Sequence, residues 1–289
     1  MRIVPIAHES FGVRSMATFV ETGDVKTLID PGVSLAPSRY GLPPHPIERE
    51  REKGCWNTVK EYAKRSDILI ITHYHYDHYN PNEPGIYEGK LAYIKHPTRM
   101  INRSQMWRSA LFLSRLKGLP RRTEFADQRE VTVQDTTIRF SKPVFHGTNQ
   151  RLGYVLEVSI TEGDERFIFT SDVEGPAVHD QVQFIIQESP QTLVIDGPMT
   201  YMLGYRYSLE SLDLANQNLV RIMEETDVKT IIIEHHFMRD LDCRSKIARV
   251  YEVADEKGIR VLSAAEYVGR PVEMLEARRR ELFEQYPVK

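Results

Sequence analysis

The chain has 289 residues, with 38 Lys and Arg against 41 Asp and Glu, a formal net charge of -3 and 41% hydrophobic residues. This composition excludes a disordered chain and argues against a protein whose main task is to coat nucleic acid. Ten histidines against two cysteines, Cys55 and Cys243, exclude a zinc ribbon or a disulfide scaffold, so a bound metal would depend on histidine and carboxylate.

The first part of the sequence predicts short strands and two helical stretches. Strands are expected at residues 15–21 and 25–29, joined by a Thr-Gly-Asp hairpin turn. A charged segment with apolar residues on one face predicts a helix at 47–65, and an aliphatic strand follows at 67–71. A second helix is expected within 98–118, where Gly118 and Pro120 end it.

The remainder alternates between strands and helices. Strands are expected at 130–134, 137–141, 153–160, 166–170 and 191–195, with a short helix before the last one. From residue 208 the pattern predicts a helix to 226, a strand at 228–234, a helix at 243–257, a strand at 259–263 and a helix at 264–285. This order predicts an α/β architecture with sheets inside and helices outside. Because no linker or repeat divides the sequence, we expect one domain over residues 1–289, with helical insertions near 40–65 and 98–118.

The strongest chemical signal is the string His-Tyr-His-Tyr-Asp-His at residues 73–78, directly after an aliphatic strand. In extended backbone, side chains alternate with period two, so His73, His75 and Asp77 leave the chain on one side. A bend after Asp77 would bring His78 to the same place. Four potential ligands within six residues indicate a metal site, because imidazole and carboxylate together suit zinc, iron or manganese.

This string resembles the signature of the metallo-β-lactamase superfamily. Further residues of that pattern follow strands in the expected order: Asp30, His146, Asp172 and the pair His235-His236. The wider pattern resembles an archaeal family of predicted metal-dependent hydrolases within the superfamily. The resemblance implies a four-layer αββα sandwich with two divalent metal ions at one edge, most simply zinc, with iron or manganese as alternatives.

The resemblance also implies how the ligands divide between the two ions. His73, His75 and His146 would bind the first, and Asp172 would bridge both. Asp77, His78 and one of the last histidine pair would bind the second. The spacing of His235 and Arg239 resembles that of nuclease branches and favours His235, with His236 as the alternative ligand or as a substrate contact. Asp30 would hold a ligand by a hydrogen bond.

Two neighbouring cations lower the pKa of water toward about 7 and so generate hydroxide for hydrolysis. Asp77 would orient this hydroxide or take up the proton that the water releases. His75 stands where redox branches tend to carry Glu, which favours hydrolysis. We therefore expect a hydrolase of a small ester, lactone or thioester. The first alternative is a phosphodiesterase or nuclease acting on RNA or DNA, favoured by the Arg239 spacing and opposed by the net charge. The second is a non-catalytic metal-binding protein, opposed by the complete ligand set.

Several other residues are weaker candidates. Asp196 follows a strand and either positions a ligand or caps a turn. Possible substrate contacts are His45, Tyr201, Arg206, His236 and Arg239. The longest aliphatic run, residues 68–71, is far shorter than the roughly 20 residues of a membrane span. We therefore expect a cytoplasmic protein with a small-molecule partner and no membrane partner, while the sequence leaves the oligomeric state open.

Overall fold

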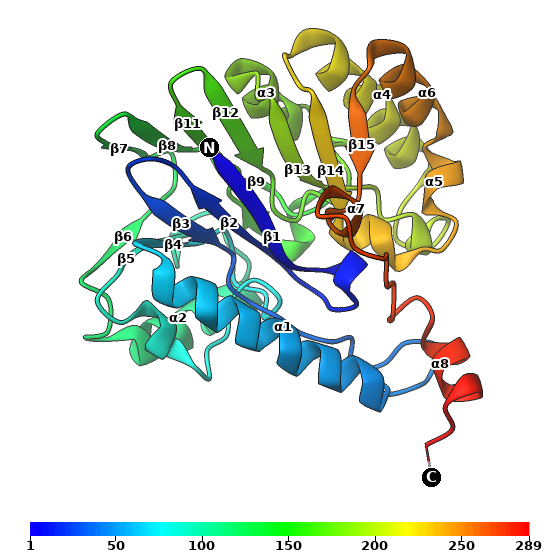
Figure 1. The fold of residues 1–289 in the computed structure, drawn as a ribbon, viewed down its shortest axis with the longest axis horizontal. Helices are drawn as coiled ribbons and strands as arrows, with labels where there is room; N and C mark the ends of the chain where they lie inside the picture. Colours follow the sequence, from blue (N-terminus) through cyan, green and yellow to red (C-terminus); the bar gives the residue numbers. More distant parts are fainter. Residues whose placement is uncertain (289) are drawn as a thin grey trace.

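The computed structural model describes residues 1–288 and contains two β-sheets that pack face to face (Figure 1). The first sheet has six strands in the order β1-β2-β3-β4-β5-β6. Their bounds are β1 Arg2–His8, β2 Met16–Glu21, β3 Lys26–Ile29, β4 Ile68–Ile71, β5 Leu91–Ile94 and β6 Arg122–Phe125. The pairs from β1 to β3 are antiparallel, and those from β3 to β6 are parallel.

The second sheet has seven strands in the order β15-β14-β13-β12-β11-β8-β7. Their bounds are β7 Glu130–Val133, β8 Thr136–Phe140, β11 Val158–Glu162, β12 Glu165–Phe169, β13 Thr192–Asp196, β14 Thr230–Glu234 and β15 Arg260–Leu262. Strands β12 to β15 are parallel to one another. A separate two-stranded ribbon pairs β9 Val144–Phe145 with β10 Tyr154–Val155.

Helices cover the outer face of each sheet, so the fold is the expected four-layer αββα sandwich (Figure 1). On the first sheet lie α1 Pro46–Arg65 and α2 Arg103–Leu116. On the second lie α3 His179–Glu188, α4 Leu209–Glu225 and α6 Ala248–Lys257. The shorter helices are α5 Cys243–Lys246, α7 Ala264–Tyr267 and α8 Arg279–Gln285. Among the described residues, no helix is both long and apolar enough to cross a membrane.

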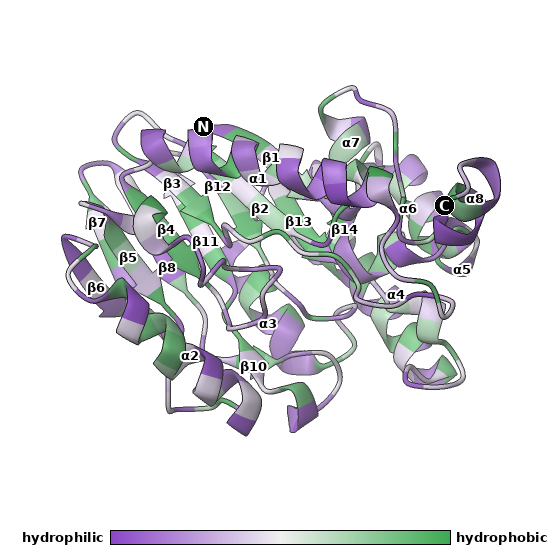
Figure 2. Cartoon of the chain, turned by 90° about the horizontal axis from the view of Figure 1, so that it is seen from below, coloured by the Kyte–Doolittle hydropathy of each residue, from purple (hydrophilic) through white to green (hydrophobic). Residues whose placement is uncertain are grey.

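The second sheet is buried on both faces, and its side chains alternate between two cores. Phe167, Phe169 and Val194 belong to the core shared with the first sheet. Ile168 and Leu193 belong to the core formed with the outer helices. This is the period-two pattern expected of parallel strands covered on both sides, and Figure 2 shows the strands as mainly hydrophobic and α1 as mainly hydrophilic.

The structure corrects several predicted elements. Strands β1, β5 and β6 lie outside the predicted elements; β1 contains Pro5, and β6 has Phe125 as its only apolar residue. The helix expected at 264–285 is wrong: α7 ends at Tyr267, and α8 begins only at Arg279. Gly269 and Pro271 lie between them, and proline disfavours helical backbone at the preceding residue. The helix expected at 243–257 is divided into α5 and α6.

The parallel strands place their carboxyl ends at one edge of the sandwich. Asp30 follows β3, and the segment 73–78 follows β4 in the first sheet. Asp172 and His235 follow β12 and β14 in the second sheet, and Asp196 is the last residue of β13. Ligands of α/β folds bind outside the carboxyl ends of such strands, which makes this edge the place to look for a site.

Candidate metal centre

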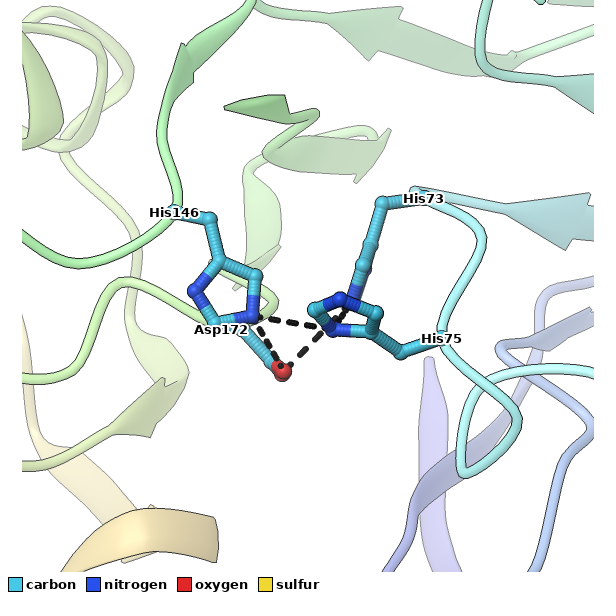
Figure 3. Close-up of side chains that lie close together, drawn as sticks. All are labelled: His73, His75, His146 and Asp172. Carbon is cyan, nitrogen blue, oxygen red and sulfur yellow. Dashed lines mark hydrogen bonds and ion pairs between the residues drawn. The ribbon is translucent and has the colours of Figure 1, made fainter. Parts of the chain in front are cut away.

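His73, His75, His146 and Asp172 form a first cluster of ligand atoms (Figure 3). The Nε2 atoms of His73 and His146 lie 3.0 and 3.1 Å from Nδ1 of His75. Asp172 Oδ2 lies 3.4 Å from His73 Nε2 and 3.1 Å from His146 Nε2. Zinc bonds of about 2.0–2.1 Å at tetrahedral angles separate ligand atoms by roughly 3.3 Å, so this donor set fits a zinc-sized cation.

Asp77, His78 and His235 form a second cluster beside the first. Asp172 Oδ1 lies 2.9 Å from His78 Nε2 and 3.3 Å from His235 Nε2. Asp77 Oδ2 lies 3.7 Å from His235 Nε2. His78 Nε2 and Asp172 Oδ1 are buried and have no hydrogen-bond partner, although they face each other. Buried polar atoms without partners are costly, and a cation between them would satisfy both.

Charges at the two clusters also fit cation binding. Burial lowers the pKa of His73 to about 4, so its imidazole is neutral near neutral pH, as a metal ligand must be. Burial likewise lowers the pKa of His78, but Asp172 and Asp30 outweigh it and raise the pKa to about 10. Burial raises the pKa of Asp172, yet the histidines around it, His235 above all, hold that pKa well below its usual range. The carboxylates therefore favour positive charge at the second cluster.

The ring nitrogens that face away from the cluster are held by polar side chains. His78 Nδ1 lies 2.7 Å from Asp30 Oδ2, a residue that the family resemblance placed beside a ligand. His235 Nδ1 lies 2.9 Å from Glu9 Oε2, and His146 Nδ1 lies 3.4 Å from Glu174 Oε1. Such outer partners fix the orientation and tautomer of a metal-binding imidazole.

Two of these positioning residues, Glu9 and Glu174, escaped the sequence analysis. Glu9 lies in the short 3-10 helix η1 Glu9–Phe11, far along the chain from the histidine it contacts. Glu174 lies two residues after Asp172, where the only local signal is a carboxylate close to a predicted ligand. Neither belongs to a spacing pattern that would separate it from an ordinary surface acid.

The two adjacent histidines have different surroundings. His235 faces Asp77 and Asp172 in the second cluster, whereas both the backbone N–H and Nδ1 of His236 lie 2.9 Å from Asp196 oxygens. His236 also lines a cleft that opens over the two clusters. Asp172, His235 and His236 nevertheless form a further group of ligand atoms. The geometry thus places His235 between two carboxylates and His236 at the wall of the cleft.

A cleft of about 670 Å³ opens over the clusters. It is lined by His75, Asp77, His146, Asp172 and His236 of the candidate site, and by Tyr201, Arg206 and Arg239 among the expected substrate contacts. His45 does not line the cleft, which corrects the expectation that it contacts substrate. It is the buried N-cap of α1, and its Nε2 lies 2.9 Å from the carbonyl oxygen of Tyr286.

The two expected helical insertions, near 40–65 and 98–118, differ in their position relative to the cleft. Helix α1 packs on β1 and β3 as part of the outer layer, with Val59 and Ala63 in the core. Helix α2 reaches the cleft through Arg108 alone. Of the region 40–65, no residue lines the cleft; the preceding loop contributes Ser34, Leu35 and Pro37 instead.

Comparison with known proteins decides the family. Residues 11–236 match the model of the metallo-beta-lactamase superfamily. The chain belongs to this superfamily. A UPF0282 protein of Korarchaeum cryptofilum is 52% identical over 289 residues, which cover 100% of this chain and 96% of the relative. This match confirms the expected resemblance to an archaeal family.

Solved structures of metallo-β-lactamase-like proteins share the fold at low sequence identity. An isothiocyanate hydrolase from Delia radicum gut bacteria is 17% identical with a TM-score of 0.56, covering 91% of this chain and 95% of the other. Igni18, a metallo hydrolase of Ignicoccus hospitalis, is 15% identical with a TM-score of 0.52, covering 94% and 95%. Together with the His/Asp clusters, the superfamily membership fits a metal-dependent hydrolase that binds divalent metal.

Proposed function

We propose that this chain is a dinuclear metal-dependent hydrolase of a small-molecule ester, lactone or thioester. One observation carries the proposal: the two oxygens of Asp172 face different histidine sets. Oδ2 faces His73 and His146, and Oδ1 faces His78 and His235. A carboxylate between two cations offsets their mutual repulsion, and the mixed nitrogen and oxygen donor set favours zinc.

The residues then have distinct tasks. His73, His75 and His146 would hold the first ion, Asp77, His78 and His235 would hold the second, and Asp172 would contribute one oxygen to each. Two divalent ions held there would supply an activated water and polarise the carbonyl oxygen of the substrate, which makes the carbonyl carbon more electrophilic.

Protein groups around the ligands fix this arrangement. Asp77 lines the cleft, where its carboxylate can orient the attacking water and accept a proton. Asp30 and Glu9 orient His78 and His235 through their Nδ1 atoms. Asp196 orients His236, whose ring lies against the substrate space.

The cleft supports a small substrate better than a nucleic acid. Its volume of about 670 Å³ lies within the range of small-molecule sites. Arg239, whose spacing suggested a nuclease, is buried and bound to Glu9 at 2.6 and 2.9 Å, so its charge is already neutralised. Of the three arginines in α2, only Arg108 lines this cleft, whereas Arg103 and Arg115 do not. The arginines of this helix therefore do not form a continuous basic surface along the cleft.

Metal analysis and a substrate panel test the proposal. Protein purified without chelator should contain about two metal ions per chain by mass spectrometry, and Asp172→Ala should lose metal and activity together. The panel contains p-nitrophenyl acetate, a γ-lactone, an acyl thioester and bis-p-nitrophenyl phosphate. Fewer than one ion per chain would contradict the dinuclear site. Hydrolysis of the phosphodiester alone would establish the phosphodiesterase alternative, and metal binding without any hydrolysis would favour the non-catalytic one.

A further inference from the structure

The cleft contains three arginines that take no part in the metal clusters. Arg108, Arg151 and Arg206 all line it, and they come from α2, from the 3-10 helix η3 Gln150–Leu152, and from the connection between η4 Thr200–Met202 and α4. Within residues 1–288, no carboxylate oxygen lies within 4.0 Å of their guanidinium nitrogens.

The other two arginines of the cleft are paired with acids. Arg14 makes a bidentate contact with Glu276 at 2.6 and 2.7 Å. Arg239 donates through Nε and Nη2 to one oxygen of Glu9, Oε1, at 2.9 and 2.6 Å, and both of those residues are buried. These paired arginines can shape the wall of the cleft, but their charges are already balanced. They differ in this respect from Arg108, Arg151 and Arg206.

The acids of the cleft do not balance the unpaired arginines either. Asp77 and Asp172 face the histidine clusters. Glu174 Oε1 lies 3.4 Å from His146 Nδ1 and 4.0 Å from His236 Nε2. The mouth of the cleft therefore carries excess positive charge in a chain whose net charge is -3. Bound cations would add to it.

Contacts with neighbouring elements hold two of these arginines in place. The Arg108 guanidinium lies 4.8 Å from the centre of the Tyr76 ring, and its Nη1 donates to the Tyr74 carbonyl at 3.4 Å. The carbonyl of Arg151 accepts a hydrogen bond of 3.2 Å from Asn102, the N-cap of α2. The first contacts hold the guanidinium of Arg108 itself, whereas the second holds only the backbone of Arg151, whose side chain is exposed.

We propose that Arg108, Arg151 and Arg206 form an oxyanion-binding subsite, so that the substrate carries a carboxylate or phosphate group besides the bond that is hydrolysed. Guanidinium forks bind the oxygens of both groups through charge-assisted hydrogen bonds. This inference rests on the proposed hydrolase function. It narrows the substrate to a small anionic molecule whose body lies against the apolar part of the cleft, including Leu35 and Met199.

Three acetate esters that differ only in one ring substituent test the subsite: phenyl acetate, 4-acetoxybenzoate and 4-acetoxyphenyl phosphate. The wild type should hydrolyse at least one anionic ester with a kcat/KM at least about tenfold above that for phenyl acetate. The better anionic ester identifies the group as carboxylate or phosphate. In Arg108→Gln and Arg151→Gln the preference should fall by about tenfold, and Arg108→Lys should restore part of it. Arg103→Gln, an exposed position of the same helix outside the cleft, is the matched control and should keep the preference.

Calorimetric binding of 4-hydroxybenzoate, phenyl phosphate and neutral phenol to the same proteins gives a second measurement, and thermal unfolding checks that each variant is folded. Anion binding that weakens about tenfold in Arg108→Gln and Arg151→Gln but not in Arg103→Gln supports the subsite, even if no ester is hydrolysed. In that case the proposed hydrolase function fails and the subsite stands. Equal hydrolysis of the three esters, or an anion preference that the Arg→Gln variants retain, overturns the subsite and leaves the hydrolase function intact.

Discussion

Replacing Gly32 with alanine should disable the second metal cluster without removing a ligand. A Cβ atom at this position would lie 2.2 Å from the backbone nitrogen of Tyr79 and 2.5 Å from the carbonyl carbon of His78. Ordinary contact begins at 3.4 Å, so the two backbone segments must move apart by about 1.2 Å (3.4 minus 2.2). Nothing flexible stands between them, because the nearest atoms all belong to backbone.

A shift of this size matters because His78 is positioned from the same two segments. Asp30, two residues before Gly32, accepts a hydrogen bond of 2.7 Å from His78 Nδ1, and moving the segments apart stretches that contact. Metal ligands must stay within about 0.5 Å of their productive positions, and a misplacement of about 1 Å can cost about 10²-fold in rate. Overpacking itself should lower the free energy of unfolding by about 1–3 kcal/mol.

Metal content by mass spectrometry, thermal unfolding and hydrolysis of the best panel ester measure the effect. Gly32→Ala should bind fewer ions than the wild type and lose about 10²-fold in kcat/KM. The matched control is Gly54→Ala in α1, where a Cβ meets nothing within 4 Å and the helix should become more stable by about 0.5–1 kcal/mol. If Gly32→Ala kept full metal content and wild-type activity, the argument that the close approach positions His78 would be refuted.

Three further predictions follow from buried carboxylates. Glu9→Gln should weaken metal binding about 10–100-fold, because His235 loses its charged partner. A competition titration with a chelator measures the affinity, and an unchanged affinity contradicts the role of Glu9 in positioning His235. Burial holds the pKa of Glu157 well above its usual range, and neither carboxylate oxygen has a partner. The folded protein holds the protonated form of Glu157 more readily than the unfolded chain does. The free energy of unfolding therefore has its full value below pH about 4.3, and it falls by up to about 1.4 kcal/mol per pH unit as pH rises toward the raised folded pKa. Glu157→Gln should therefore raise the free energy of unfolding at pH 7 and not at pH 4, and an equal effect at both pH values in urea titrations would exclude this cause. Arg279→Met should lower the free energy of unfolding by about 3–5 kcal/mol, because the fully buried Glu48 loses its bidentate partner at 2.8 Å. The double variant Glu48→Leu/Arg279→Met should recover most of this loss, because no charge is then left buried without a partner. A double variant no more stable than the single one contradicts the reasoning.

The sequence predicted the strands that lead into the site because each carries an uninterrupted apolar run before a polar residue. Residues 68–71 and 231–233 are of this kind, and His73 and His235 follow shortly after them. Burial on both faces leaves such runs recognisable without any alternation. The four-layer arrangement came from the family resemblance, since strand order cannot be deduced from periodicity alone.

Predictions failed where long-range contacts decide the structure. The contact between Glu9 and His235 joins residues 226 apart, and no local spacing encodes it. Edge strand β6 Arg122–Phe125 is mostly exposed and carries few apolar residues, so pairing with β5 rather than burial defines it. The break between α7 and α8 did have a local signal in Gly269 and Pro271, but the charged helical pattern on either side concealed it.

The ligands of the two clusters come from both sheets, and this has a consequence for stability. Residues 73–78 leave the first sheet, while His146, Asp172 and His235 belong to the second half of the chain. An ion held by both sets would be a reversible cross-link that closes a loop of 71 residues or more, and it would restrict the unfolded chain much as a disulfide does. The protein has only two cysteines, and both are free and buried. Metal ions would therefore provide the cross-link between the two halves of the chain. Stability and catalysis would then depend on the same supply of metal.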